Sequence, residues 1–125
     1  MSEKYSSFTE LEVWKKARVF KNDIKGLVTH FPSEEKFRLV DQIVRSTRSI
    51  NANIAEGHGR FSYKDQIHFC VQARGSLSET HNHLIDSLDC TYITEEIYQS
   101  YKEKIMEIER LLNGYISWLR SKVSS

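Results

Sequence analysis

The sequence predicts an all-α protein folded as an antiparallel, up-down-up-down four-helix bundle. Its 125 residues include one proline and five glycines, so residues that break helices are scarce. Apolar residues recur every three or four positions in four separate stretches, which is the periodicity of amphipathic helices. The stretches between them are short, and short connections favour antiparallel neighbours. We therefore expect one domain over residues 1–125, with helices at about 10–30, 34–56, 63–90 and 95–121.

The first predicted helix, 10–30, begins after Thr9, a residue type that commonly caps helix N-termini. Pro32 disfavours helical geometry at the residue before it, so this helix should end near Phe31. The apolar positions are spaced 4, 3, 4, 3 and 4 residues apart: Val13, Ala17, Phe20, Ile24, Leu27 and Phe31.

The second predicted helix, 34–56, is expected to begin after Ser33 as its cap, with Glu34 and Glu35 near its positive end. We expect it to stop at Gly57, because many helices end at a residue that tolerates a positive φ. Its expected buried face consists of Phe37, Val40, Ile43, Thr47, Ile50 and Ile54.

The third predicted helix, 63–90, follows a capping pair formed by Ser62 and Asp65. Two polar residues, Arg74 and His81, fall on its apolar seam. The other seam residues are Ile67, Cys70, Leu77, Leu84 and Leu88.

The fourth predicted helix, 95–121, has Thr94 as its expected N-cap, and Arg120 and Lys122 complement its negative end. Its apolar face is formed by Ile97, Tyr101, Ile105, Ile108, Leu112, Tyr115 and Leu119. Three aromatic residues flank the helical seams and are expected to be exposed for contacts between subunits: Trp14, Tyr98 and Trp118.

Charge is distributed unevenly along the chain, although the net charge is only +1. Residues 36–74 carry seven basic and three acidic side chains, a net charge of +4. Residues 75–109 carry two basic and eight acidic side chains, a net charge of -6. Such a molecule is suited to head-to-tail self-association or to a charged partner on one side.

The composition also excludes several classes of protein. No stretch approaches the roughly 18 consecutive apolar residues of a membrane span, and residues 1–7 lack the features of a secretory signal. We therefore expect a cytoplasmic protein with no membrane association. Cys70 and Cys90 lie 20 residues apart on one predicted helix, about 30 Å, which excludes a disulfide between them.

No motif indicates catalysis, a cofactor or a metal site. The Glu-x-x-His pairs of di-iron bundles are missing, and no C-x-x-C pair is present. We expect the protein not to be an enzyme; an enzymatic alternative depends only on unassigned histidines such as His81.

Four stretches resemble a known family: residues 11–17 (LEVWKKA), 31–35 (FPSEE), 49–60 (SINANIAEGHGR) and 73–79 (ARGSLSE). In this order and spacing they are similar to the four-helix bundle proteins encoded in intervening sequences of 23S ribosomal RNA genes. The likeness is weaker after Glu79, where DCTYI at 89–93 replaces the usual pattern before the last helix. The resemblance implies a homopentamer. It also implies a relation to the accessory proteins of diversity-generating retroelements, which bind nucleic acid and a polymerase through basic surfaces.

Arg45 and Arg48 lie about 160° around the second helix from its apolar seam, so they should face away from the core. With Arg60 and Lys64 across the following linker, they form a candidate patch for the phosphates of RNA or DNA. The alternative is a solvated face or a contact between subunits.

Arg74 and Gly75 form a predicted structural node. A buried guanidinium needs partners, and a glycine inside a helix suggests close approach of another helix or subunit. The stripe Gln42, Ser46, Ser49, Asn53 and Glu56 is the expected source of partners for Arg74 or for a neighbouring subunit. We assign eight residues of the family-like stretches to this node: Asn53, Glu56, Gly57, Gly59, Arg74, Gly75, Ser76 and Glu79.

The sequence thus favours a non-enzymatic, homo-oligomeric interaction module whose partners include copies of itself or another protein. The alternative is an accessory protein that binds RNA or DNA through a basic patch repeated around a ring.

Overall fold

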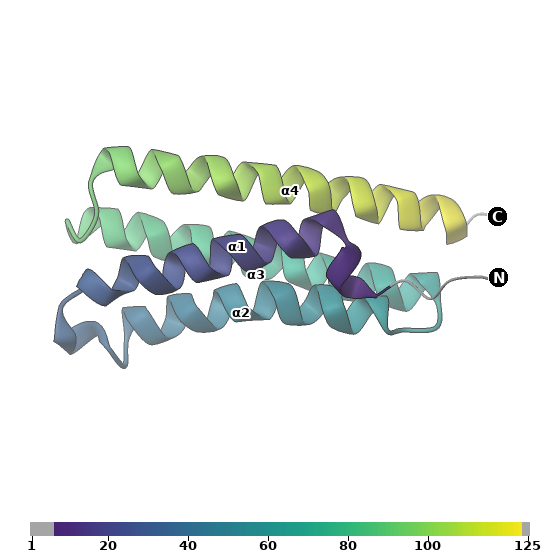
Figure 1. Cartoon of the computed structure of the whole chain (residues 1–125), viewed down its shortest axis with the longest axis horizontal. Coiled ribbons are helices and arrows are strands. Elements are labelled where there is room, and N and C mark those ends of the chain that lie inside the picture. The colour runs from purple at the N-terminus through teal and green to yellow at the C-terminus, as the bar shows by residue number, and fades with distance from the viewer. Residues whose placement is uncertain (1–6, 124–125) are drawn as a thin grey trace.

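The computed structural model describes residues 7–123, which fold into four long helices and contain no strand. The helices are α1 (Glu12–Leu27), α2 (Leu39–His58), α3 (Tyr63–Asp89) and α4 (Glu95–Val123). Consecutive helices run in opposite directions, and α1 begins at the end of the molecule where α4 finishes (Figure 1). The prediction of an all-α four-helix bundle is therefore confirmed.

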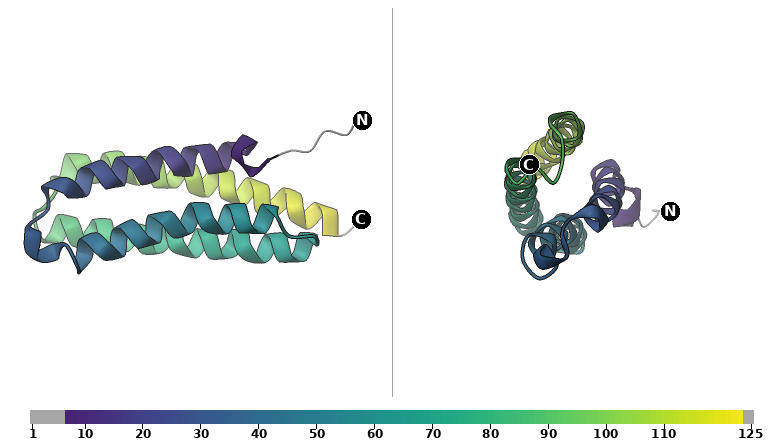
Figure 2. Two further views of the ribbon diagram at one scale, coloured as in Figure 1. Left: turned by 60° about the horizontal axis from the view of Figure 1, so that its bottom comes forward. Right: turned by 90° about the vertical axis from the view of Figure 1, so that its left-hand side faces the viewer.

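The helices follow one another around a common centre in the order α1, α2, α3 and α4 (Figure 2). The contact between α2 and α3 is the most extensive, and the contact between α1 and α4 is the least. Within residues 7–123, no helix has both the length and the apolar character needed to cross a bilayer.

The core is filled by the apolar faces of all four helices. Removal of each Ile, Leu or Phe side chain from water contributes about 1.5–3 kcal/mol to folding. The largest side chains with less than 2% exposure are Phe20, Ile24, Ile43, Ile50, Ile54, Leu77, Leu84, Ile108, Leu112, Ile116 and Leu119.

The start of α1 differs from the prediction. Thr9 lies within a short 3-10 helix, Phe8–Glu10, and its N–H donates to the Ser7 hydroxyl at 3.2 Å. The α-helix begins only at Glu12, after Leu11, whose apolar side chain makes no cap. The prediction that Thr9 caps this helix was wrong because the chain makes a separate turn first. The last turn, Val28–His30, is also a 3-10 helix.

The start of α2 was predicted five residues too early. A 3-10 helix, Ser33–Glu35, follows Pro32, and the backbone at Arg38 is not helical. Glu35 then accepts a hydrogen bond from the N–H of Leu39 at 3.3 Å, which satisfies the first turn of α2. Phe37 therefore lies outside the helix and is 84% exposed, not buried as predicted.

Gly57 does not end α2. The helix continues to His58, and no glycine among residues 7–123 has a positive φ. A Cβ atom at Gly57 would lie 3.0 Å from the Cβ of Phe69 and 3.1 Å from the carbonyl oxygen of Gln66. This glycine is needed because α3 packs directly against the backbone of α2.

The predicted N-caps of the last two helices are confirmed. The Ser62 hydroxyl accepts from the N–H of Asp65 at 3.1 Å, and the Thr94 hydroxyl accepts from the N–H of Ile97 at 3.1 Å. Tyr98 was expected to be exposed, but it is buried, and its hydroxyl lies 2.8 Å from Nε2 of His81.

Candidate functional site

The four predicted phosphate-binding residues fall into two groups. Arg45 and Arg48 are exposed in the middle of α2. Arg60 and Lys64 lie beyond its last residue, His58, which is itself about 15 Å from Arg48 along the helix axis at 1.5 Å per residue. Arg60 is already paired with Glu56 at 2.6 Å, and its guanidinium lies 4.6 Å from the ring centre of Phe69. The structure therefore does not bring these four side chains into one continuous patch.

Arg48 instead belongs to a cationic cleft between α1 and α2, which sequence analysis missed. Lys21 and Lys25 of α1 and Arg48 of α2 line a depression of about 80 Å³. The other lining residues are Asn22, Val44 and Thr47, so the cleft contains no carboxylate. Two signals could have revealed it. Arg18, Lys21 and Lys25 share one face of α1, and this helix carries five basic and two acidic side chains.

The residues of the predicted structural node make several separate local contacts. Arg74 is half-buried and donates to Oδ1 of Asn113 on α4 at 2.9 Å, so its partner is not the polar stripe of α2. Glu79 lies 3.3 Å from His83 on its own helix. Gly59 follows α2 in a turn with a φ of -81°.

The polar stripe of α2 pairs with hydroxyl groups of α3. The Ser46 and Thr80 hydroxyls are 2.7 Å apart, and Ser76 donates to Ser49 at 2.9 Å. Asn53 bonds within its own helix, to the carbonyl oxygen of Ser49 at 2.9 Å. The first two contacts join α2 to α3 through buried and half-buried polar groups that satisfy one another.

The two glycines of the node have different surroundings. Gly57 is buried between α2 and α3, as described above, whereas Gly75 is exposed and has nothing within 4 Å of an added Cβ atom. The expected close approach at Gly75 is therefore wrong for helices of the same chain. Any close neighbour there would belong to another molecule.

An aromatic pocket lies where the ends of the helices meet the α2–α3 linker. Its volume is about 430 Å³. The Tyr115 and Trp118 rings are nearly parallel, with centres 6.1 Å apart and an interplanar angle of 10°. Burial raises the pKa of Tyr115 to about 12. The lining residues are Leu11, His58, Tyr63, Gln66, Tyr115 and Trp118.

A second apolar groove separates α1 from α4. It has a volume of about 230 Å³ and is floored by Phe20 and Ile108. Two ion pairs cross it, Lys104 to Asp23 at 3.0 Å and Lys16 to Glu107 at 3.7 Å. All four charged side chains are partly exposed, so each pair contributes at most about 1 kcal/mol.

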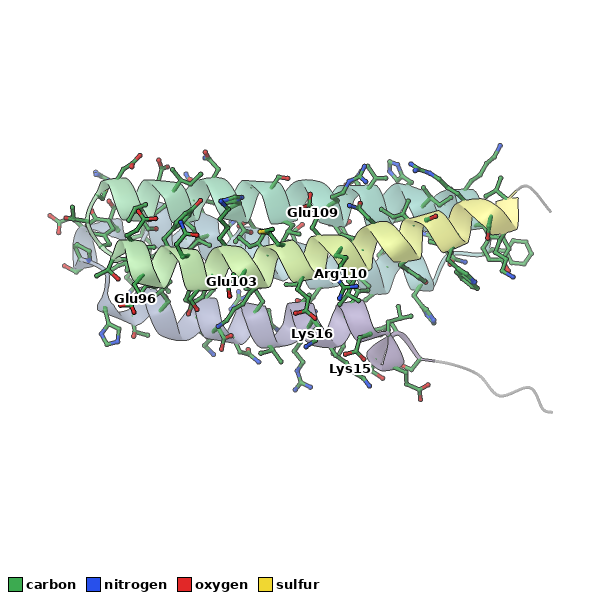
Figure 3. The ribbon with its side chains drawn as sticks, turned by 90° about the horizontal axis from the view of Figure 1, so that it is seen from above. Lys15, Lys16, Glu96, Glu103, Glu109 and Arg110 are labelled. Carbon is green, nitrogen blue, oxygen red and sulfur yellow. The ribbon has the colours of Figure 1, made fainter. Side chains whose placement is uncertain are left out.

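The acidic segment of the sequence forms the hairpin between α3 and α4. Figure 3 shows Glu96, Glu103 and Glu109 along α4, on the face turned to the viewer. Arg110 follows them, and Lys15 and Lys16 project from the neighbouring α1. Residues 75–109 thus carry negative charge around the turn of the α3–α4 hairpin, and α1, which lies beside α4, carries a net charge of +3.

No arrangement typical of a metal centre occurs among residues 7–123, where no three His, Cys, Asp or Glu side chains come together to hold an ion. His81 bonds Tyr98, and the buried His83 lies beside Glu79. These histidines thus have structural contacts within the bundle.

Comparisons with known proteins agree with the family resemblance. The family model described as 23S rRNA-intervening sequence protein matches residues 9–114. A crystal structure of a protein of unknown function from the S23 ribosomal protein family of Bacteroides thetaiotaomicron is 34% identical to this chain. The match covers 84% of this chain and 95% of that one, with a TM-score of 0.77. The comparison with curated proteins gave no match. The chain therefore belongs to the family of 23S rRNA-intervening sequence proteins.

Proposed function

We propose that this protein is a non-enzymatic interaction module that assembles with copies of itself into a ring, which by family resemblance contains five subunits. The observation that carries the proposal is an exposed, uncharged stripe on α3. Its members are spaced 4, 3, 4 and 3 residues apart, as at a helix–helix contact. They are Val71, Gly75, Ser78, Asn82 and Ile85.

Two properties of this stripe suit a contact with another subunit. Val71 and Ile85 expose 37% and 38% of their surface, respectively, and would gain from burial. Gly75 and Ser78 lie between them and have small side chains, which allow a second helix to come close. A partner helix would also account for Gly75, which costs α3 about 1 kcal/mol relative to alanine and has no neighbour within the chain.

The distribution of charge supports a ring over a symmetric dimer. The basic α1 and the acidic segment 75–109 carry net charges of +3 and -6, and the pairs that join Lys16 to Glu107 and Lys104 to Asp23 neutralise neither of them. A head-to-tail contact would bring opposite charges together at every interface, and such contacts generate rings when the rotation closes.

Light scattering on a sizing column tests the assembly. The wild type should have a mass of several times 14.7 kDa, five times if the ring is a pentamer. Ile85→Lys should shift the protein towards a monomer because it places a charge in the stripe. Ile97→Lys is a matched control, since Ile97 on α4 is 37% exposed but lies outside the stripe. A monomeric wild type, or equal effects of both variants, would contradict the proposal.

Nucleic-acid binding is a second candidate function, favoured by the cationic cleft. Lys21, Lys25 and Arg48 converge there without a carboxylate in the lining, so a phosphate group would relieve their mutual repulsion. A ring would present several copies of this cleft, and their combined binding would exceed that of one.

Fluorescence anisotropy with labelled oligonucleotides tests this candidate. Arg48 lines the cleft, and Arg45 is exposed three residues before it on the same helix. Reversing the charges of both residues should weaken binding. The slope of log affinity against log salt should fall by about 0.7–0.9 for each phosphate that the variant no longer neutralises. Lys36→Glu changes the charge in the turn before α2 and should have little effect. Unchanged binding by the double variant would rule out this surface.

A further inference from the structure

The aromatic pocket at the end of the bundle has the composition of a ligand site. Residues from before α1, from α2, from α3 and from α4 converge on it, and its volume of about 430 Å³ lies within the range of small-molecule sites. Its walls are largely aromatic. Tyr63 and Trp118 remain 42% and 49% exposed although each ring would gain from burial. These rings therefore offer apolar surface that the folded chain does not cover.

The geometry of the rings suits a flat ligand. Trp118 lies nearly parallel to Tyr115, and the Nζ atom of Lys122 lies 5.2 Å from its ring centre, so two side chains restrict the orientation of its ring. A planar ring entering beside Tyr63 and Trp118 can stack without ordering these large side chains first. Stacking on such prepositioned aromatic surfaces is how many proteins bind unpaired bases.

The pocket also carries polar groups that suit the edge of a base. His58 and Gln66 line it together with Tyr63 and Tyr115. The amide nitrogen of Gln66 donates to the carbonyl oxygen of Arg60 at 3.0 Å, which fixes the side chain and leaves its oxygen as an acceptor. A few fixed polar groups within an apolar wall are typical of specific ligand sites.

The lining of the pocket contains no carboxylate, and basic residues lie beside its aromatic rings. Lys64 follows Tyr63, and the Nζ atom of Lys122 lies 5.2 Å from the ring centre of Trp118. The segments that form the pocket also carry Glu10, Glu12, Glu56 and Asp65, so their four basic residues are balanced by four acidic ones, and contacts to phosphate depend on Lys64 and Lys122. The basic residues are Lys64, Arg120, Lys122 and Arg60, which pairs with Glu56.

We infer that this pocket binds an unpaired base of single-stranded nucleic acid, while the neighbouring basic residues contact its phosphates. This inference rests on the second candidate function above and adds a site to it. A duplex would not fit as well, because its bases are already stacked and paired. The aromatic pocket would thus select single strands, whereas the cationic cleft contacts only phosphate.

Tryptophan fluorescence and anisotropy together test the inference. Trp14→Phe leaves Trp118 as the one remaining tryptophan of the two in the chain. In this background, a single-stranded oligonucleotide of RNA or DNA should quench Trp118, and a duplex of the same length should not. An abasic strand of equal length should bind through its phosphates without quenching. Quenching of the same size by the abasic strand would overturn the inference.

Substitutions in the pocket give a second test. Trp118→Leu should weaken binding of the normal single strand by roughly 5- to 150-fold, the effect of losing one stacked base. It should leave binding of the abasic strand unchanged, and Trp118→Phe should restore part of the affinity.

Three results would separate the possible failures. If neither strand binds to any variant, the nucleic-acid function itself is wrong. If both strands bind equally well and depend only on Arg45 and Arg48, that function holds and the pocket does not contribute. If Trp118→Leu instead lowers the mass in light scattering, the pocket is occupied by another copy of the chain, and the inference is wrong.

Discussion

Between α2 and α3, the helices come so close at Gly57 that a Cβ atom would meet Phe69 at 3.0 Å. Between α1 and α4, a groove of about 230 Å³ stays open and is crossed by two partly exposed ion pairs. The first contact is made by small residues and short hydroxyl side chains, the second by long, flexible charged ones. The bundle is therefore fixed on one side and adaptable on the other, and substitutions of similar size should have very different effects on the two sides.

The largest effect is expected at Gly57. Gly57→Val should lower the free energy of unfolding by about 3 kcal/mol, because the new side chain overlaps Phe69 and the backbone of α3. Urea denaturation followed by circular dichroism measures this change. Gly114→Ala, on α4, is the control and should stabilise the protein by about 0.5–1 kcal/mol, since an added Cβ atom there has nothing within 4 Å. Helix propensity alone would stabilise both variants, so an unchanged or higher stability of Gly57→Val would contradict close packing at this position.

Raising the pH should have a smaller effect on the free energy of unfolding, through the Cys70 thiol buried on α3. Burial raises the pKa of Cys70 from its usual 9.0 to about 11. The folded state therefore keeps a proton that the unfolded state loses above pH 9, so this contribution to stability is full below pH 9 and disappears as the pH rises towards 11. The expected loss is about 2 kcal/mol. Tyr115, whose pKa is raised to about 12, adds to it above pH 10.

Urea titrations between pH 8 and pH 11 measure this loss. Cys70→Ala should flatten the dependence on pH, whatever its effect on absolute stability. Cys90→Ala should not change it, because that thiol is exposed. A pH dependence that is the same in all three proteins would mean that water reaches Cys70 in the folded state.

The smallest effect on the free energy of unfolding is expected in the groove between α1 and α4. Asp23→Asn removes the pair with Lys104 and should cost about 0.5 kcal/mol at low salt. The difference from the wild type should vanish in 1 M salt, where the screening length falls to about 3 Å. Glu103→Gln, on the exposed face of α4 in Figure 3, is the control. A loss of stability above 2 kcal/mol for Asp23→Asn would mean that the contact between α1 and α4 is as tightly packed as the contact between α2 and α3.

The core of this bundle was predictable because it depends on spacing within each helix. Seam residues such as Ile24, Ile50, Leu84 and Leu112 were placed correctly from periodicity alone. The start of α2 was not, because its cap comes from Glu35, a residue outside the helix. Phe37 has the correct spacing for the α2 face but precedes the helix, so periodicity placed it wrongly.

Features that depend on two helices at once could not be predicted from spacing. The sequence does not say which glycine faces a neighbouring helix, so Gly57 and Gly75 were given the wrong roles within the chain. The cationic cleft requires knowing that Lys21 lies opposite Arg48. The aromatic pocket joins residues as distant as Leu11 and Trp118, and only the folded chain brings them together.

One carboxylate joins the two halves of the molecule at the end opposite the aromatic pocket. Besides capping α2, Glu35 accepts a hydrogen bond at 2.7 Å from the hydroxyl of Tyr92, which is 57 residues away in the turn between α3 and α4. The Phe31 and Tyr92 rings also meet there, with centres 5.2 Å apart.

The contacts of Tyr92 with Glu35 and Phe31 affect domain swapping. A protein built from two helical hairpins can exchange one hairpin with a second copy and rebuild the same core between two chains. Exchange requires the two turns to separate, and the contacts of Tyr92 with Glu35 and Phe31 hold them together. The same contacts would form again between two chains after an exchange, so they do not change the equilibrium, but they slow the exchange because they must break before the hairpins separate.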